Sequence, residues 1–160
     1  MTDENSDAEL PPQYAEPVAY QLPDHVLMAL VTAADTIDME LSVTLHVSGV
    51  VVSGTLISEA RLYEQLAEAL RQVPPPPDMP EGALSGPAAL ATAFDSSAEE
   101  YREQAELDRS RNEPPPVIYI HLRDAAVWAP GGEPLPRMLW RGRLSHVSGW
   151  SLGALGRKGG

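Results

Sequence analysis

The alternation of apolar and polar residues over positions 41–57 limits the fold of this chain more than any other feature. Residues 41–47 alternate strictly between aliphatic side chains on one side and serine, threonine or histidine on the other. This pattern is typical of a strand with one buried face. Ser48-Gly49 then predicts a tight turn, and residues 50–57 a second strand. The sequence therefore predicts an antiparallel β-hairpin.

Glycines within the predicted strands indicate that these strands bend. Gly54, in the middle of the second strand, predicts a bulge or a sharp bend. Residues 139–153 read Leu-Trp-Arg-Gly-Arg-Leu-Ser-His-Val-Ser-Gly-Trp-Ser-Leu-Gly and hold three glycines between apolar residues. That density is typical of strands that bend or approach another backbone closely. A strand is predicted at 117–128, and residues 138–152 predict either two further strands or one strongly bent strand.

Helices are predicted before and after the hairpin. Asp24 is the expected N-cap of the first, which ends at residues 35–38, and Ser58 is the expected N-cap of the second. Four consecutive prolines from Pro74 stop the second helix, because proline lacks the amide donor. The fold class is therefore α+β. We expect a small, strongly bent antiparallel sheet or an Sm-like barrel of about five strands, with an N-terminal helix, a helix after strand 2 and a long polar insertion.

The chain divides into three regions by composition. Residues 1–22 are acidic, contain prolines and lack apolar periodicity, which predicts a disordered arm. Residues 23–153 form a single domain, and residues 154–160 a flexible tail. Within the domain, residues 74–116 are predicted to be a surface insertion, because the segment is too long for an ordinary loop. One exposed, mainly polar helix is expected in its second half, at 97–111.

Charge is strongly negative and unevenly distributed. The net charge is −12 and the isoelectric point about 4.6, which disfavours nucleic acid and anionic lipid as partners. No lysine or arginine precedes Arg61, whereas six basic residues face two acidic ones from Val117 onward. Either the two halves neutralise each other in the fold, or the cationic late strands bind an acidic partner or the acidic arm of another copy.

The start of the chain lacks the basic and apolar regions of a signal peptide, and no stretch is apolar for long enough to span a membrane. We therefore expect a cytoplasmic protein that binds neither nucleic acid nor membrane.

Motifs of catalysis, metal binding or cofactor binding are not found in the sequence. Cysteine is absent, which excludes disulfides and thiolate sites. The four histidines, His25, His46, His121 and His146, have no spacing typical of a metal site. Nucleophile-elbow and phosphate-loop patterns are also missing. We expect no catalytic residue, no metal and no cofactor, and predict that the protein is not an enzyme.

Arginine and tryptophan residues are the candidate binding residues. Arg141 and Arg143 flank Gly142, so they should point to the same face of a strand, with Trp140 on the opposite face. Such a pair could grip a carboxylate or an acidic segment, or be a solvated surface pair above a core tryptophan. Trp128 and Trp150 have the same ambiguity, because tryptophan is common both at interface hot spots and in cores. The predicted binding residues are Arg141, Arg143, Trp128 and Trp150.

Two resemblances to known families extend this prediction. The glycine and valine pattern of residues 45–56, with Arg141-Gly142 and Trp150 much later, resembles Sm-like barrels, which bind RNA. Ser53-Gly-Thr-Leu-Ile-Ser58, Ile120-His-Leu122 and the 139–153 run are similar, in this order, to the gas vesicle accessory protein GvpU family. This second resemblance runs from about Asp38 to Gly153 and does not include residues 74–116.

The GvpU resemblance implies a non-enzymatic, cytoplasmic accessory protein of gas vesicles, one that acts on vesicle assembly or on clustering by protein–protein interaction. The expected partners are the gas vesicle wall or other gas vesicle proteins, together with self-association. An Sm-like nucleic-acid-binding or regulatory module is the alternative function.

Overall fold

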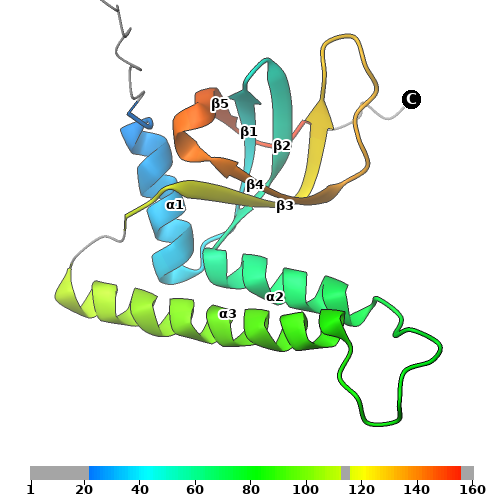
Figure 1. Ribbon diagram of the computed structural model, residues 1–160. Helices are drawn as coiled ribbons and strands as arrows, with labels where there is room; N and C mark the ends of the chain where they lie inside the picture. Colours follow the sequence, from blue (N-terminus) through cyan, green and yellow to red (C-terminus); the bar gives the residue numbers. More distant parts are fainter. Residues whose placement is uncertain (1–21, 113–115, 156–160) are drawn as a thin grey trace, which may run out of the picture.

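The computed structural model describes residues 22–112 and 116–155 as an α+β fold with one five-stranded antiparallel sheet. The elements in chain order are α1 His25–Ile37, β1 Leu41–Val47, β2 Val50–Ile57, α2 Glu59–Arg71, α3 Gly86–Arg111, β3 Tyr119–Trp128, β4 Met138–Arg143, a 3-10 turn Leu144–His146 and β5 Val147–Leu152. The strand order is β4-β3-β2-β1-β5. Figure 1 shows the sheet above the α2–α3 pair, with α1 at its side.

The predicted hairpin is confirmed as β1 and β2. The two strands pair antiparallel from Val47 opposite Val50, so the turn has two residues. Ser48 and Gly49 both adopt positive φ, 49° and 85°, as a twisted two-residue hairpin turn requires. Gly54 was predicted to mark a bulge or a sharp bend, and the β2–β3 register does shift beside it, between Ser53 and Thr55, with the extra residue in β3.

The sheet is curled but does not close into a barrel. β4 and β5 lie at opposite edges of the strand order, yet only three residues of 3-10 turn join them. The sheet must therefore curl enough to bring its two edges to either end of that turn (Figure 1). Among the described residues β4 and β5 do not pair, so of the two predicted forms the Sm-like barrel is wrong and the strongly bent open sheet is the observed one. The 138–152 region is two strands rather than one.

α1 covers the inner face of the curled sheet and completes the core. Its predicted N-cap is confirmed, because the Asp24 carboxylate accepts hydrogen bonds from the amides of Val26 and Leu27, both at 2.9 Å. The helix buries Leu27, Val31 and Ala34 against inward residues of the strands. The strand members of this cluster are Val43, Leu45, Val52, Leu56, Ile120, Leu122 and Ala125. Burial of these aliphatic side chains is the main favourable contribution to folding of the domain.

The 74–116 region differs from the expectation in the extent of its helix. A single 26-residue helix, α3, begins at Gly86 rather than near Ser97, and Ser85 caps it through the amide of Ala88. The first half of α3 is rich in alanine and has no strong apolar stripe. Ala91 and Ala98 are nevertheless only 1% exposed, because small side chains let α3 approach α2 closely. Tyr63 of α2 also stacks on the Tyr101 ring at 5.3 Å.

Two ion pairs join α2 and α3, between Arg71 and Asp95 and between Arg102 and Glu64. α3 therefore packs along α2 and is not a separate exposed helix. The status of 74–116 as an insertion stays a prediction. The predicted arm, 1–22, and tail, 154–160, lie almost wholly outside the described residues.

Candidate functional site

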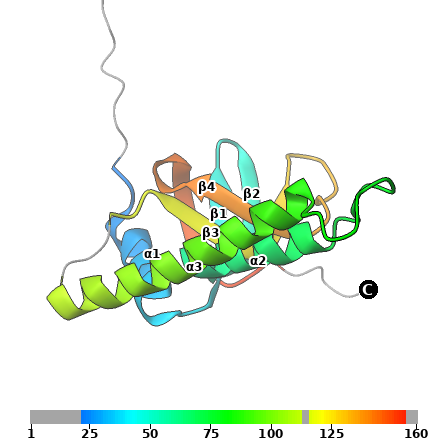
Figure 2. The ribbon, with the colours of Figure 1, turned by 60° about the horizontal axis from the view of Figure 1, so that its bottom comes forward.

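A groove of about 1070 Å³ lies where the helices meet the start of β3. The end of α1 and the start of α2 form one wall, and the C-terminal half of α3 forms the other. Residues 116–119 and Arg141 of β4 complete it. In Figure 2 the C-terminal half of α3 crosses in front of α1. The lining residues are Asp35, Thr36, Ile37, Asp38, Ser58, Glu59, Ala60, Tyr101, Arg102, Gln104, Ala105, Glu106, Asp108, Arg109, Pro116, Val117, Ile118, Tyr119 and Arg141.

A connected set of polar groups crosses one end of the groove. The Asp35 carboxylate accepts the backbone N–H of Glu59 at 2.8 Å, and the Glu59 carboxylate accepts a hydrogen bond from Arg141 at 3.3 Å. Burial raises the pKa of Asp35 to about 6, against the lowering effect of the Glu59 amide, and the Glu59 charge adds to the rise. Burial and the same Glu59 charge raise the pKa of Tyr101 to about 12. This end of the groove therefore concentrates negative charge in a partly buried position.

Two further polar contacts hold the groove walls in place. Arg109 of α3 donates to the Thr36 carbonyl at the end of α1. Ser58, the N-cap of α2, accepts the Arg61 amide at 3.3 Å and donates to Asp38 at 3.0 Å. These contacts fix α3 against α1 and α1 against α2, so the groove is set by the packing of three helices.

Arg141 and Arg143 share one face of β4, as predicted. Their guanidinium carbons lie 4.1 Å and 6.0 Å from the centre of the Tyr119 ring, a cation–π arrangement. Arg141 also pairs with Glu59, whereas Arg143 is exposed and has no ion pair among the described residues. Trp140 is partly buried against the core, as predicted for the opposite face. The arginine pair thus lies beside the groove and Arg141 lines it.

The sequence has an acidic first half and basic late strands, a division that we call the charge split. Ion pairs within the fold neutralise part of it. Arg123 pairs with Glu40 at 2.6 Å, and Arg141 with Glu59 at 3.3 Å. Two late-strand arginines therefore meet acidic residues from the first half of the chain. Each pair is more than a third exposed on its arginine side, so its contribution to stability is small.

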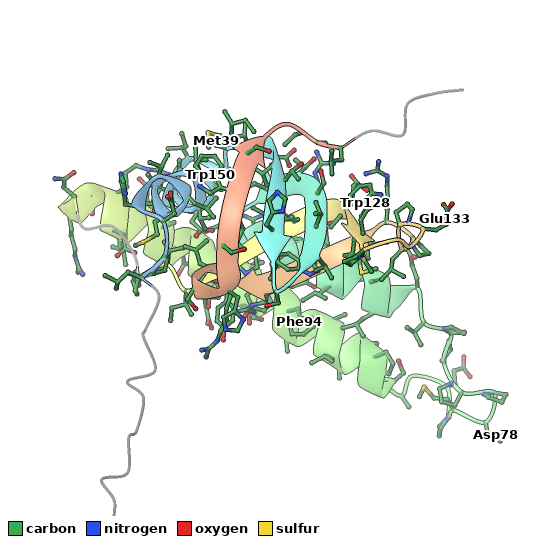
Figure 3. All side chains as sticks on the ribbon, turned by 90° about the horizontal axis from the view of Figure 1, so that it is seen from above. Met39, Asp78, Phe94, Trp128, Glu133 and Trp150 are labelled. Carbon is green, nitrogen blue, oxygen red and sulfur yellow. The ribbon has the colours of Figure 1, made fainter. Side chains whose placement is uncertain are left out.

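Trp128 and Trp150 do not join the arginine pair. Trp150 packs against the core cluster, and its indole helps the Leu27 amide to lower the pKa of Asp24. Trp128 is half-buried at the end of β3, opposite Val51. Figure 3 shows the two tryptophans well apart, Trp150 beside α1 and Trp128 on the other side of the sheet. The four predicted residues therefore do not form one surface, and the contact role of the tryptophans stays a prediction.

His121 of β3 is fully buried, unlike His46 and His146. Its side chain is 1% exposed. Burial, and to a smaller extent the charge of Arg141, lowers its pKa to about 4. Within residues 22–112 and 116–155, no cluster of three or more His, Asp or Glu side chains could hold a metal ion. Over the same residues, no helix is both long and apolar enough to cross a bilayer.

The groove itself was not predicted from the sequence. Its walls come from residues 35–38, 58–60, 101–109 and 116–119, which are far apart in the chain and carry no shared motif. The sequence offered one signal, which was apolar residues such as Ile37 and Ile118 at the ends of predicted elements, outside the predicted buried faces. Scattered apolar residues of this kind are common on protein surfaces, so the signal alone could not locate a site.

Comparison with known proteins identifies the family. The family model described as gas vesicle protein GvpU-like matches residues 24–155. The matched span begins earlier than the expected Asp38 and extends across residues 74–116, and whether the resemblance skips that region stays a prediction. No curated protein and no solved structure matches the chain. Because the matched span contains every described helix and strand, the chain belongs to the GvpU-like family of gas vesicle proteins.

Proposed function

We propose that this chain is a non-enzymatic accessory protein that binds other gas vesicle proteins, or the vesicle wall, during vesicle assembly or clustering. Its place of action is the cytoplasm, at the vesicle surface. The family match supports the link to gas vesicles. The observation that carries the binding role is the arginine pair, Arg141 and Arg143, held over one tyrosine ring beside a large groove.

The chemistry of the arginine pair fits recognition of a carboxylate on a partner. Tyr119 holds both guanidinium groups on one face, so less side-chain entropy is lost when they bind. Arg143 has donors that no ion pair occupies among the described residues. A vesicle wall repeats the same surface many times, so several weak contacts of this kind would add to a firm attachment. Nucleic acid is a poor alternative partner, because the net charge is −12.

The test is co-flotation of the purified full chain with intact gas vesicles. We expect Arg141→Glu with Arg143→Glu to lower the affinity for vesicles at least tenfold, because reversed charges repel the partner's carboxylates. Arg111→Glu with Arg137→Glu is the matched control, since it changes the net charge equally at exposed arginines outside the pair. Arg143→Gln alone, which disturbs no described ion pair, should give a smaller loss in the same direction.

The outcomes test the accessory role and the arginine binding site separately. Wild-type protein that neither floats with intact vesicles nor binds any purified gas vesicle protein would contradict the accessory role. Equal binding by the folded arginine double variant and by wild type would exclude this face and leave the role to another surface.

A further inference from the structure

Three large apolar side chains open into the groove from three separate elements. Ile37 at the end of α1 is 66% exposed, Ile118 before β3 is 55% exposed, and Tyr101 of α3 is 41% exposed. Leaving such side chains in water costs free energy. Where several gather in one concave place, the surface is typical of a binding site. The groove therefore presents an apolar surface that a binding partner can cover.

The size of the groove suits a short helix. A helix about 10 Å in diameter that rises about 1.5 Å per residue occupies about 120 Å³ per residue. The groove volume of about 1070 Å³ is therefore large enough to take one face of a short helix. α3 provides a straight helical wall over Tyr101–Arg109, along which a second helix can pack.

The charge of the groove selects a basic occupant. All three lining arginines already have acidic partners: Arg102 pairs with Glu64, Arg109 with Glu106, and Arg141 with Glu59. Two lining carboxylates, Asp35 and Asp108, have hydrogen bonds but no ion pair among the described residues. An incoming helix therefore meets neutralised cations and unmatched acids, a field that attracts lysine or arginine.

The acidic N-terminal segment and a second copy of the chain both fit the groove poorly. Residues 1–21 carry five acidic residues and no basic one, so the negative groove repels them. A second copy brings a net charge of −12 of its own, so two grooves facing each other also repel. A partner of opposite charge is favoured over both.

We propose that the groove between α1, α3 and the start of β3 binds an amphipathic helix of a partner protein, apolar on one face and flanked by lysine or arginine. The apolar face covers Ile37, Ile118 and Tyr101, and the basic flanks approach Asp35 and Asp108. This is helix-in-groove recognition. The inference rests on the proposed accessory role, in which that partner is another gas vesicle protein.

The test uses the full chain and three fluorescent 14-residue probe peptides, measured by anisotropy. One probe has leucines at helical spacing on one face with lysines beside them, the second has glutamate in place of lysine, and the third has the first composition with the leucines spread around the helix. We expect the first probe to bind at least tenfold more tightly than either of the others. The third probe controls for attraction between a cationic peptide and an acidic protein.

Variants then locate the binding. Ile37→Ser with Ile118→Ser should weaken binding of the first probe at least tenfold, while leaving the melting temperature nearly unchanged because both side chains are exposed. Leu135→Ser with Leu152→Ser, at side chains 54% and 62% exposed outside the groove, should stay within twofold. Asp108→Asn should weaken binding three- to fivefold. Its control is Asp78→Asn, in the distant loop labelled in Figure 3.

Several results would overturn the inference. Equal binding of all three probes, tighter binding of the glutamate probe, or unchanged binding by the Ile37 and Ile118 double variant would each do so. A change in the sedimentation of the chain alone in that variant would make the groove an interface between copies instead.

The vesicle flotation assay separates this inference from the accessory role. If the wild-type protein does not float with vesicles, the accessory role is contradicted, and the peptide measurements still test whether the groove binds a helix. If the wild-type protein floats and the groove variants float equally well, only the inference about the groove is contradicted.

Discussion

His121 is a single residue that affects the stability of the whole sheet. It lies between Ile57 and Arg141 in the strand register, and among the described residues neither ring nitrogen has a hydrogen-bond partner. A buried polar group without a partner costs about 1–3 kcal/mol. Because the pKa of His121 falls from 6.5 to about 4 on folding, the unfolded chain binds more protons between these values. Stability is therefore fully present above pH 6.5 and is lost as the pH falls toward 4.

We predict that His121→Leu raises the free energy of unfolding by about 1–2 kcal/mol at pH 7.5. Its advantage over wild type should grow by roughly 2 kcal/mol between pH 7.5 and pH 5. Urea denaturation at both pH values measures this. Asp35, whose raised pKa acts in the opposite direction over pH 4–6, contributes equally to both proteins and cancels in the difference. His46→Leu, at an exposed histidine on β1, is the control for replacing a strand histidine by leucine. A pH-independent difference for His121→Leu would contradict the prediction.

At the scale of elements, the contact of β2 with β3 depends on Gly54. A Cβ atom at this position would lie 2.9 Å from the Ala125 Cα and 2.9 Å from the Arg123 carbonyl oxygen. Both are backbone atoms and cannot move without displacing the strand. The β2–β3 register shifts at this place, so glycine lets the two strands approach at the bend.

We predict that Gly54→Ala lowers the free energy of unfolding by about 1–3 kcal/mol, because the added methyl group forces the strands apart. Gly149→Ala is the matched control in β5, where the nearest atom to an added Cβ is 3.8 Å away, and should change stability by less than about 0.5 kcal/mol. Thermal and urea denaturation measure both. Equal stability of the two variants would show that the close approach is not limiting.

At the scale of the whole molecule, association between copies depends on which electrostatic effect is larger. The net charge of −12 makes copies repel, whereas the acidic first half and the cationic β4 favour contact between unlike surfaces. Added salt screens both effects. The direction of the salt dependence therefore tells which one controls association.

If copies associate through the charge split, as we predict, sedimentation velocity should show association at 50 mM salt that weakens at 500 mM. Association that strengthens with salt would indicate that net repulsion dominates. A strict monomer at high concentration, or an assembly insensitive to salt, would rule out the charge-split mechanism.

Local features of the fold could be predicted because they depend on neighbouring residues. Asp24 and Ser58 were identified as N-caps from the residue types that satisfy free helix amides. The hairpin followed from alternation and from Ser48-Gly49. The common face of Arg141 and Arg143 followed from the period of a strand.

The candidate site could be predicted only in part, because it is made by contacts between distant segments. Arg141 was identified, but Tyr119, which holds it, and Glu59, which pairs with it, were not. The start of α3 at Gly86 was missed because alanine carries little apolar signal. The alanines of α3 become buried only when α2 packs against that helix.

The sequence by itself determined the α+β class, the hairpin, the caps and the family, since these depend on local periodicity, residue type and motif order. The tertiary structure decided that the sheet stays open between β4 and β5, that α3 packs on α2, and that Ile37, Tyr101 and Ile118 meet in one groove. The physical reason is that these outcomes depend on how helices and strands far apart in the chain pack together, and no local pattern encodes that packing.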